Sequence, residues 1–189
     1  ASSGAVAVRG GGSSIGINAL INGATDICAS SRQMKKSERD KARSRGIVVN
    51  EIPVALDGLA IIVNASNKVD SISMDELRKI YIGQITNWSQ VGGANEPITV
   101  FSRDSNSGTY GFFQQVVLKN QNWGKSVRFM PSTSEEIRET TRSEGGIAYG
   151  GVAYFKNKRG IKILSVSAKA GSPALAPNEA NVRNRSYPI

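Results

Sequence analysis

Short apolar runs alternate with helix-opening signals along this chain, and that alternation restricts its fold more than any other feature. Leu59–Val63 is a continuous apolar run, which is typical of a strand buried on both faces of a sheet. Ser73–Glu76 is a capping box that opens a helix, and Ser132–Glu136 opens another. Further strands are predicted at Ala5–Val8, Ile47–Ile52, Ile98–Phe101, Gly146–Tyr149 and Ile161–Val166. Strands that alternate with helices predict an α/β fold with a mainly parallel sheet.

The charge balance indicates an anionic partner. The 189 residues include 24 Lys and Arg against 15 Asp and Glu, which gives a formal net charge of +9. A small oxyanion, a nucleic acid and a membrane surface would each suit that charge, and charge alone does not choose among them.

The sequence lacks the patterns that enzymes and metal sites require. It contains no histidine, so a Ser-His-Asp triad is impossible and the commonest metal ligand is missing. Its acidic residues are scattered, without the spacing of a carboxylate pair or a metal cluster. Cys28 is the only cysteine, which excludes an intrachain disulfide. We therefore predict no enzymatic activity, no cofactor and no metal. No run of about 18 apolar residues is present to span a membrane.

Two segments share one physical device, a strand that runs into a Ser/Gly/Thr-rich turn and then into a helix. The first is Val8–Ser14 and the second is Phe101–Thr109. A helix start leaves backbone N–H groups unpaired and carries a partial positive charge. Serine and threonine hydroxyls add hydrogen bonds, and Arg103 adds a planar fork that matches two oxyanion oxygens. The two turns together predict a cradle for phosphate, sulfate or carboxylate.

The densest basic stretch is Met34–Arg45. Acidic residues interrupt it and it contains no aromatic side chain on which a base could stack. A solvated helix face is therefore the better interpretation of this stretch than a nucleic-acid site.

Several ordered motifs resemble one family, the substrate-binding protein of the phosphate ABC transporter, which is a type II periplasmic binding protein. The matching segments are GGGSSIGINALINGATDICASSRQMKKSE (10–38), LDGLAIIVNASN (56–67), ISMDELRKIYIGQITNWSQVGG (72–93), ITVFSRDSNSGTYGFF (98–113), GGIAYGGVAYF (145–155) and YPI (187–189). IYIGQITNW followed by SRDSNSGT is the most specific combination. The resemblance covers nearly the whole chain.

The resemblance implies two α/β lobes with mixed, mainly parallel sheets, joined by two crossover strands, with phosphate held in the cleft between them. On that pattern residues 1–57 are an incomplete first lobe, 58–182 the second lobe and 183–189 the start of the return crossover. The family's first strand and its C-terminal segment would lie outside this sequence. The resemblance also implies a periplasmic or extracytoplasmic location, with membrane contact only through the transporter or a lost N-terminal anchor.

The family's phosphate contacts match particular positions of this chain. They are Ser13 and Ser14 after the glycine cluster, Ser31 and Arg32 where the family's next strand ends, and Arg103, Ser105, Ser107, Gly108 and Thr109 in the second turn. Some members place aspartates at the positions of Ser31 and Ser105. A buried carboxylate accepts a hydrogen bond from a protonated phosphate oxygen and repels sulfate, so serine at both positions leaves selectivity for phosphate over sulfate open.

The function implied by the resemblance is binding of inorganic phosphate and its delivery to the permease subunits of an ABC importer, without nucleic acid. Three alternatives stay open: a binding protein for sulfate or molybdate, a phosphate-sensing domain of a signalling protein, and a nucleic-acid or adhesion role driven by the +9 charge.

Overall fold

The computed structural model describes residues 5–189, and these divide into two compact units. The first unit consists of the chain up to Glu51 together with the turn Ser105–Gly108. The second consists of Ile52–Asp104 and Thr109–Ile189. The turn Ser105–Gly108, which is part of the second predicted anion-binding segment, is thus grouped with the N-terminal part of the chain.

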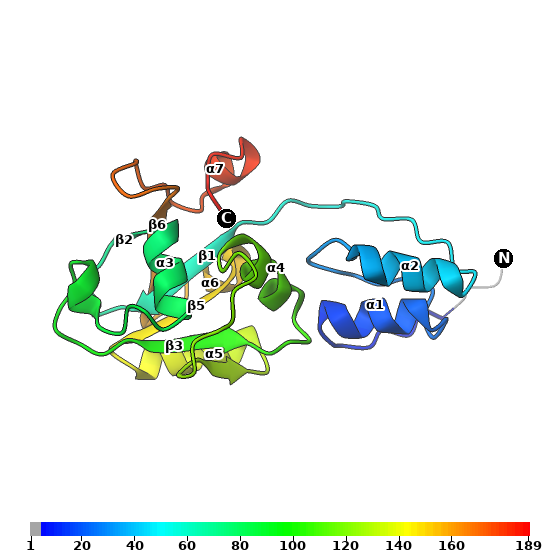
Figure 1. The fold of residues 1–189 in the computed structure, drawn as a ribbon, viewed down its shortest axis with the longest axis horizontal. Helices are drawn as coiled ribbons and strands as arrows, with labels where there is room; N and C mark the ends of the chain where they lie inside the picture. Colours follow the sequence, from blue (N-terminus) through cyan, green and yellow to red (C-terminus); the bar gives the residue numbers. More distant parts are fainter. Residues whose placement is uncertain (1–4) are drawn as a thin grey trace. The chain divides into compact units, whose positions relative to one another are not determined.

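Within the described residues, the second unit contains one sheet of six strands in the order β2-β6-β1-β5-β3-β4 (Figure 1). The strands are β1 (Leu59–Asn64), β2 (Ser71–Ser73), β3 (Thr99–Arg103), β4 (Arg128–Met130), β5 (Gly146–Gly151) and β6 (Ile161–Ser167). The helices are α3 (Met74–Tyr81), the 3-10 helix η1 (Trp88–Val91), α4 (Gly108–Val116), α5 (Thr133–Arg142), α6 (Val152–Phe155) and α7 (Glu179–Arg183).

The sheet is mixed. β1 pairs antiparallel with both β5 and β6. The pairs β2–β6, β3–β4 and β3–β5 are parallel. The predicted α/β architecture is therefore confirmed, and all four strands predicted for this unit form, with β3 starting one residue later and ending two residues later than expected.

The central strand β1 explains why its sequence is apolar without interruption. All six of its residues are buried, because helices cover both faces of the sheet. Leu59, Ile61 and Val63 join a core that includes residues of α3 and α4. Ala60 and Ile62 point to the opposite face and join the core beneath α5 and α6.

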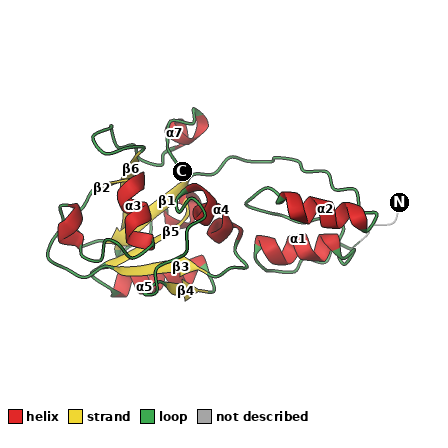
Figure 2. Cartoon of the chain, viewed as in Figure 1, coloured by secondary structure: helices red, strands yellow, loops and turns green. Residues whose placement is uncertain are grey.

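The first unit, as far as the structure describes it, contains two helices and no strand (Figure 2). They are α1 (Ser13–Ile21) and α2 (Lys36–Ser44), which share a small core of Ile17, Ile21, Met34 and Ala42. Helix α2 is the basic stretch of the sequence. It is mostly exposed, as expected for a solvated face.

Two strand predictions in this unit are wrong. Ala5–Val8 and Ile47–Ile52 have no regular structure, and Val6, Val8 and Val48 are exposed. Alternating apolar residues make a strand only where a neighbouring strand pairs with the backbone, and no described segment of this unit does so.

The last residues of the chain pack on the start of β1. The buried Tyr187 hydroxyl donates to the Leu59 carbonyl at 3.0 Å, and the Leu59 N–H donates to the Ile189 carbonyl at 3.3 Å. Residues 128 positions apart therefore lie side by side at one end of the second unit. No helix among residues 5–189 is long and apolar enough to cross a bilayer.

The capping box predicted at Ser73 forms: its Oγ accepts from the Glu76 N–H at 3.3 Å, and the Glu76 carboxylate accepts from the Ser73 N–H at 2.8 Å. Ser73→Ala should therefore lower the free energy of unfolding by about 1 kcal/mol. Urea unfolding followed by circular dichroism measures this. Ser172→Ala, at an exposed turn serine, is the matched control. Equal stability of the two variants would contradict a role for the cap.

Candidate functional site

The start of α1 lies against the turn Ser105–Gly108, within the first unit. The Ser14 N–H donates to the Asn106 carbonyl at 3.1 Å, and the Ser14 hydroxyl donates to the Ser105 carbonyl at 3.4 Å. Gly12, the N-cap of α1, is so close to Asn106 that a methyl group there would overlap the Asn106 carbonyl oxygen. The absence of a side chain at Gly12 is what lets the two backbones meet.

Ser13, Ser31 and Gly108 form the centre of this contact. The Ser31 N–H donates to the Ser13 Oγ at 3.1 Å, and the two hydroxyl oxygens lie 3.3 Å apart. A methyl group at Gly108 would lie 2.5 Å from the Ser31 Oγ and would also overlap the Ser13 hydroxyl. Ser13 and Ser107 are both buried. Hydroxyls and the start of a helix are thus concentrated around one glycine.

Arg32 lies beside this group and is held by an acid. Its guanidinium donates to both oxygens of the Glu38 carboxylate, at 2.7 and 2.8 Å, and more weakly to the Ser14 Oγ at 3.4 Å. The hydrogen bonds from Arg32 hold the pKa of Glu38 below its usual range. Glu38 also accepts from the Lys35 N–H at the start of α2. The Glu38 carboxylate therefore neutralises much of the positive charge of Arg32.

Arg103 is the last residue of β3, in the second unit. Its Nη1 donates to the Thr133 Oγ1 and its Nη2 to the Pro131 carbonyl, both at 3.1 Å. Its Nε is buried and has no hydrogen-bond partner in the described part of the chain. Thr109, also in the second unit, lies in the first turn of α4.

The nine predicted contact residues are thus divided between the units. Those of the first unit are Ser13, Ser14, Ser31, Arg32, Ser105, Ser107 and Gly108, while Arg103 and Thr109 belong to the second and flank the turn in the sequence. Hydrogen bonds connect Ser13 with Ser31, and Ser14 with the turn and with Arg32.

Sequence reasoning missed the surroundings of Arg103. Glu136 on α5 is completely buried, and neither of its carboxylate oxygens has a hydrogen-bond partner among residues 5–189. Ser102 is also fully buried, with its Oγ 2.7 Å from the Tyr149 hydroxyl. A glutamate in the first turn of a helix is ordinary on a protein surface, so the sequence carries no signal that this one is buried.

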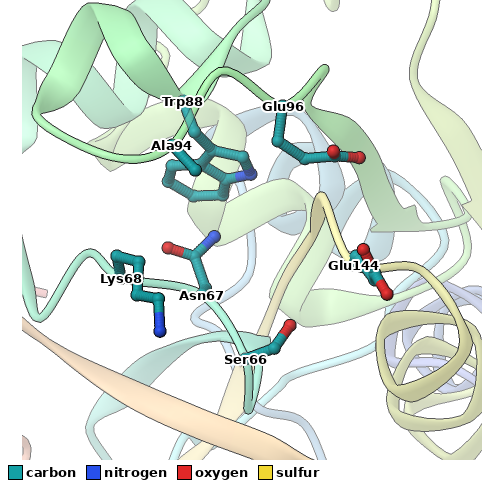
Figure 3. Close-up of a pocket in the computed structure, with 7 residues that line it drawn as sticks. All are labelled: Ser66, Asn67, Lys68, Trp88, Ala94, Glu96 and Glu144. Carbon is teal, nitrogen blue, oxygen red and sulfur yellow. The ribbon is translucent and has the colours of Figure 1, made fainter.

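A pocket of about 250 Å³ in the second unit contains none of the nine predicted contact residues (Figure 3). It is lined by Ser66, Asn67, Lys68, Trp88, Ala94, Glu96 and Glu144. Figure 3 shows the Glu96 and Glu144 carboxylates on the same side of the pocket, which does not suit an anion. Glu96 precedes β3 and Glu144 precedes β5, whereas Arg103 is the last residue of β3. Because a five-residue strand extends about 16 Å, these two carboxylates lie near the opposite end of β3 from Arg103. No group of three potential metal ligands occurs in the described residues.

Comparisons with known proteins agree on one family. Residues 3–189 match the family model described as a PBP superfamily domain. The protein SphX of Synechococcus elongatus is 34% identical over 189 residues, covering 96% of this chain and 56% of its own length. The phosphate-binding protein PstS of Pseudomonas aeruginosa is 27% identical, covering 97% of this chain and 60% of its own length. The chain therefore spans a little over half of these relatives.

Solved structures give the same fold. A Clostridium perfringens protein crystallised with bound phosphate has a TM-score of 0.82 at 28% identity, covering 94% of this chain and 68% of that one. An ABC-type phosphate transport receptor from Vibrio cholerae has a TM-score of 0.72 at 28% identity, covering 96% and 70%.

Glu38→Gln should weaken the first unit by about 1–2 kcal/mol at neutral pH, because Arg32 loses a charged, bidentate partner. The lowered pKa of Glu38 means that its contribution is present above the ordinary carboxyl pKa and is lost as the pH falls through the folded-state value. The difference in stability between Glu38→Gln and the wild type should therefore become smaller in acid.

Amide hydrogen exchange of α1 and α2 measures this difference in stability. Asp40→Asn, which breaks only exposed pairs with Lys36 and Arg43, is the control and should leave exchange nearly unchanged. A deficit that did not change with pH would contradict the assignment.

Proposed function

Because this chain belongs to the PBP superfamily, we propose that it binds inorganic phosphate and delivers it to the permease of an ABC-type importer. Delivery of this kind takes place on the outer side of a membrane, so the proposal includes an extracytoplasmic location. It involves no covalent chemistry: the bound ion leaves as it entered.

One observation carries the proposal, the meeting of α1 with the turn Ser105–Gly108 around Ser13 and Ser31. Hydroxyls that contact one another in the absence of an anion can rotate to donate to one. The start of α1 adds partial positive charge at the same place. The names of the relatives from Pseudomonas aeruginosa and Vibrio cholerae, and the phosphate in the Clostridium perfringens structure, support phosphate as the ion.

The nine residues would contribute different donor groups and charges to the binding of phosphate. Hydroxyls of Ser13, Ser14, Ser31, Ser105, Ser107 and Thr109, with the Gly108 N–H, would donate to phosphate oxygens. Arg103 would supply the charge-assisted fork, because a guanidinium carries five N–H donors in a planar arrangement that matches two oxyanion oxygens. Arg32 would contribute charge at longer range, since Glu38 takes both of its Nη groups. This number of donors is needed because a desolvated phosphate with unpaired oxygens is costly to hold.

Calorimetry with inorganic phosphate tests the proposal, and Arg103→Ala is the most informative variant. Loss of the guanidinium should weaken binding by about 2–4 kcal/mol, or roughly 30- to 1,000-fold in Kd. Arg142→Ala, an exposed arginine at the end of α5, is the charge-matched control and should bind as the wild type does. Failure of the wild type to bind phosphate at micromolar concentration would refute the proposal, and equal affinity of the Arg103→Ala variant would remove Arg103 from the site.

The second candidate function is binding of another oxyanion, such as sulfate. Serine at positions 31 and 105 is the observation that supports this candidate. A hydroxyl accepts a hydrogen bond from a phosphate P–OH group, but it does not repel sulfate as a carboxylate would. We expect sulfate to compete measurably with phosphate in the wild type. Ser31→Asp should raise the preference for phosphate over sulfate by about tenfold or more. Competition calorimetry measures both ratios, with Ser31→Asn as the uncharged control. An unchanged ratio in Ser31→Asp would place Ser31 away from the ion.

A further inference from the structure

The start of α5 supplies the partners of Arg103. Thr133, the first residue of the helix, accepts from Nη1, and Pro131, two residues earlier, accepts from Nη2. Ser132 caps the helix by accepting from the Glu135 N–H at 3.2 Å, which fixes the position of this turn. Glu136 follows Thr133 by three positions and therefore lies on the same helix face. Arg103 is thus held by a hydroxyl and a carbonyl at the start of α5, and Glu136 lies one turn further along the same helix face.

Arg103 and Glu136 each have a buried group without a partner. The Arg103 Nε–H is a donor, the Glu136 carboxyl is an acceptor, and neither makes a hydrogen bond within residues 5–189. Leaving a buried donor or a buried carboxylate unpaired costs free energy in both cases. The two groups have opposite charges, and the Arg103 charge acts on the Glu136 carboxyl. A change of side-chain rotamer that pairs them would satisfy both at once.

Arg103 is the cation that acts on this carboxyl. Tyr149 on β5 and Tyr81 on α3 feel the Glu136 charge, and both are neutral phenols whose pKa values burial raises further. Strand β1 has no titratable side chain. The remaining titratable groups on the strands that pack against α5 are Arg128 on β4, which is exposed, and Lys162 on β6, which pairs with Asp70. The remaining charged residues of α5 are Glu135, Arg138, Glu139 and Arg142, which pair with one another.

Building on the proposed function, we propose that Glu136 is a positioning residue that tunes anion binding through Arg103. Above its raised pKa the Glu136 carboxyl ionises, and a change of rotamer then lets the carboxylate pair with the Arg103 Nε–H and compete with the anion. When phosphate occupies the guanidinium, Glu136 takes up one proton from water, because two anions on one guanidinium repel each other. The neutral acid then leaves the full charge of Arg103 to the ion. Burial, which raises the pKa of Glu136 against the opposing effect of Arg103, makes this protonation accessible.

The test is the phosphate affinity of the wild type and of Glu136→Gln between about pH 5.5 and about pH 8.5. The ratio of the two dissociation constants at each pH cancels the titration of phosphate itself. The wild-type constant divided by that of Glu136→Gln should rise with pH, by about tenfold over this range, because only the wild type acquires the competing carboxylate. Glu135→Gln removes a surface carboxylate one position away and should give a ratio that does not change with pH.

Glu136→Met is the second variant, in case the glutamine amide is not tolerated in a buried site. It removes the charge without introducing polar atoms, and replacement of an unpaired buried charge by an apolar side chain is often stabilising. It should give the same pH-dependent ratio. Because the raised pKa means that the folded chain holds a proton that the unfolded chain loses, wild-type stability should fall as pH rises above the ordinary carboxyl pKa. Both variants should lack that fall in thermal unfolding.

The outcomes separate the two proposals. A wild type that binds phosphate, with affinity ratios independent of pH for both Glu136 variants, overturns the role of Glu136 and leaves phosphate binding intact. A wild type that does not bind phosphate at any pH overturns both. A ratio that rises with pH in Glu136→Gln and Glu136→Met, but not in Glu135→Gln, supports Glu136 as the group that takes up the proton.

Discussion

The candidate site depends on one close approach, that of Gly108 to the hydroxyls of Ser13 and Ser31. There is no space for even a methyl group at this point. The approach brings a turn from the middle of the chain against the start of α1, and it places donors from three separate segments around a few atoms. Hydroxyls and backbone N–H groups bind an anion well only when such crowding is built into the fold, since each contributes little alone.

The sequence was most informative where a single segment determines the outcome. The capping box at Ser73 and the apolar run of β1 both formed as predicted, because helix caps are local and a run apolar on both faces has few alternatives. Ile47–Ile52 was wrong because strand formation depends on a partner that a pattern does not reveal. Glu136 could not be foreseen for a related reason: its burial is decided by the sheet beneath α5, not by its neighbours in the chain.

Arg103, which we propose as a ligand contact, is positioned by residues that are not themselves proposed contacts. It stands next to the glycine-rich turn in the sequence, but its hydrogen bonds are made to residues about thirty positions later. The start of α5 and the residue Pro131 before it therefore help to orient the guanidinium. Glu136, on the same helix, adds an electrostatic influence to this mechanical one. If Arg103 holds the anion as we propose, a substitution at Glu136 would alter the affinity without a change in any contact residue.

The pairing of Leu59 with Tyr187 and Ile189 has a topological consequence. The two ends of the segment 59–189 are hydrogen-bonded neighbours, which is the arrangement that tolerates circular permutation. Joining residue 189 to residue 59 through a brief linker, and opening the chain at an exposed loop elsewhere, would give a circular permutant with the same sheet. The hydrogen bonds of Leu59 with Tyr187 and Ile189 are what bring these two ends close enough for such a join.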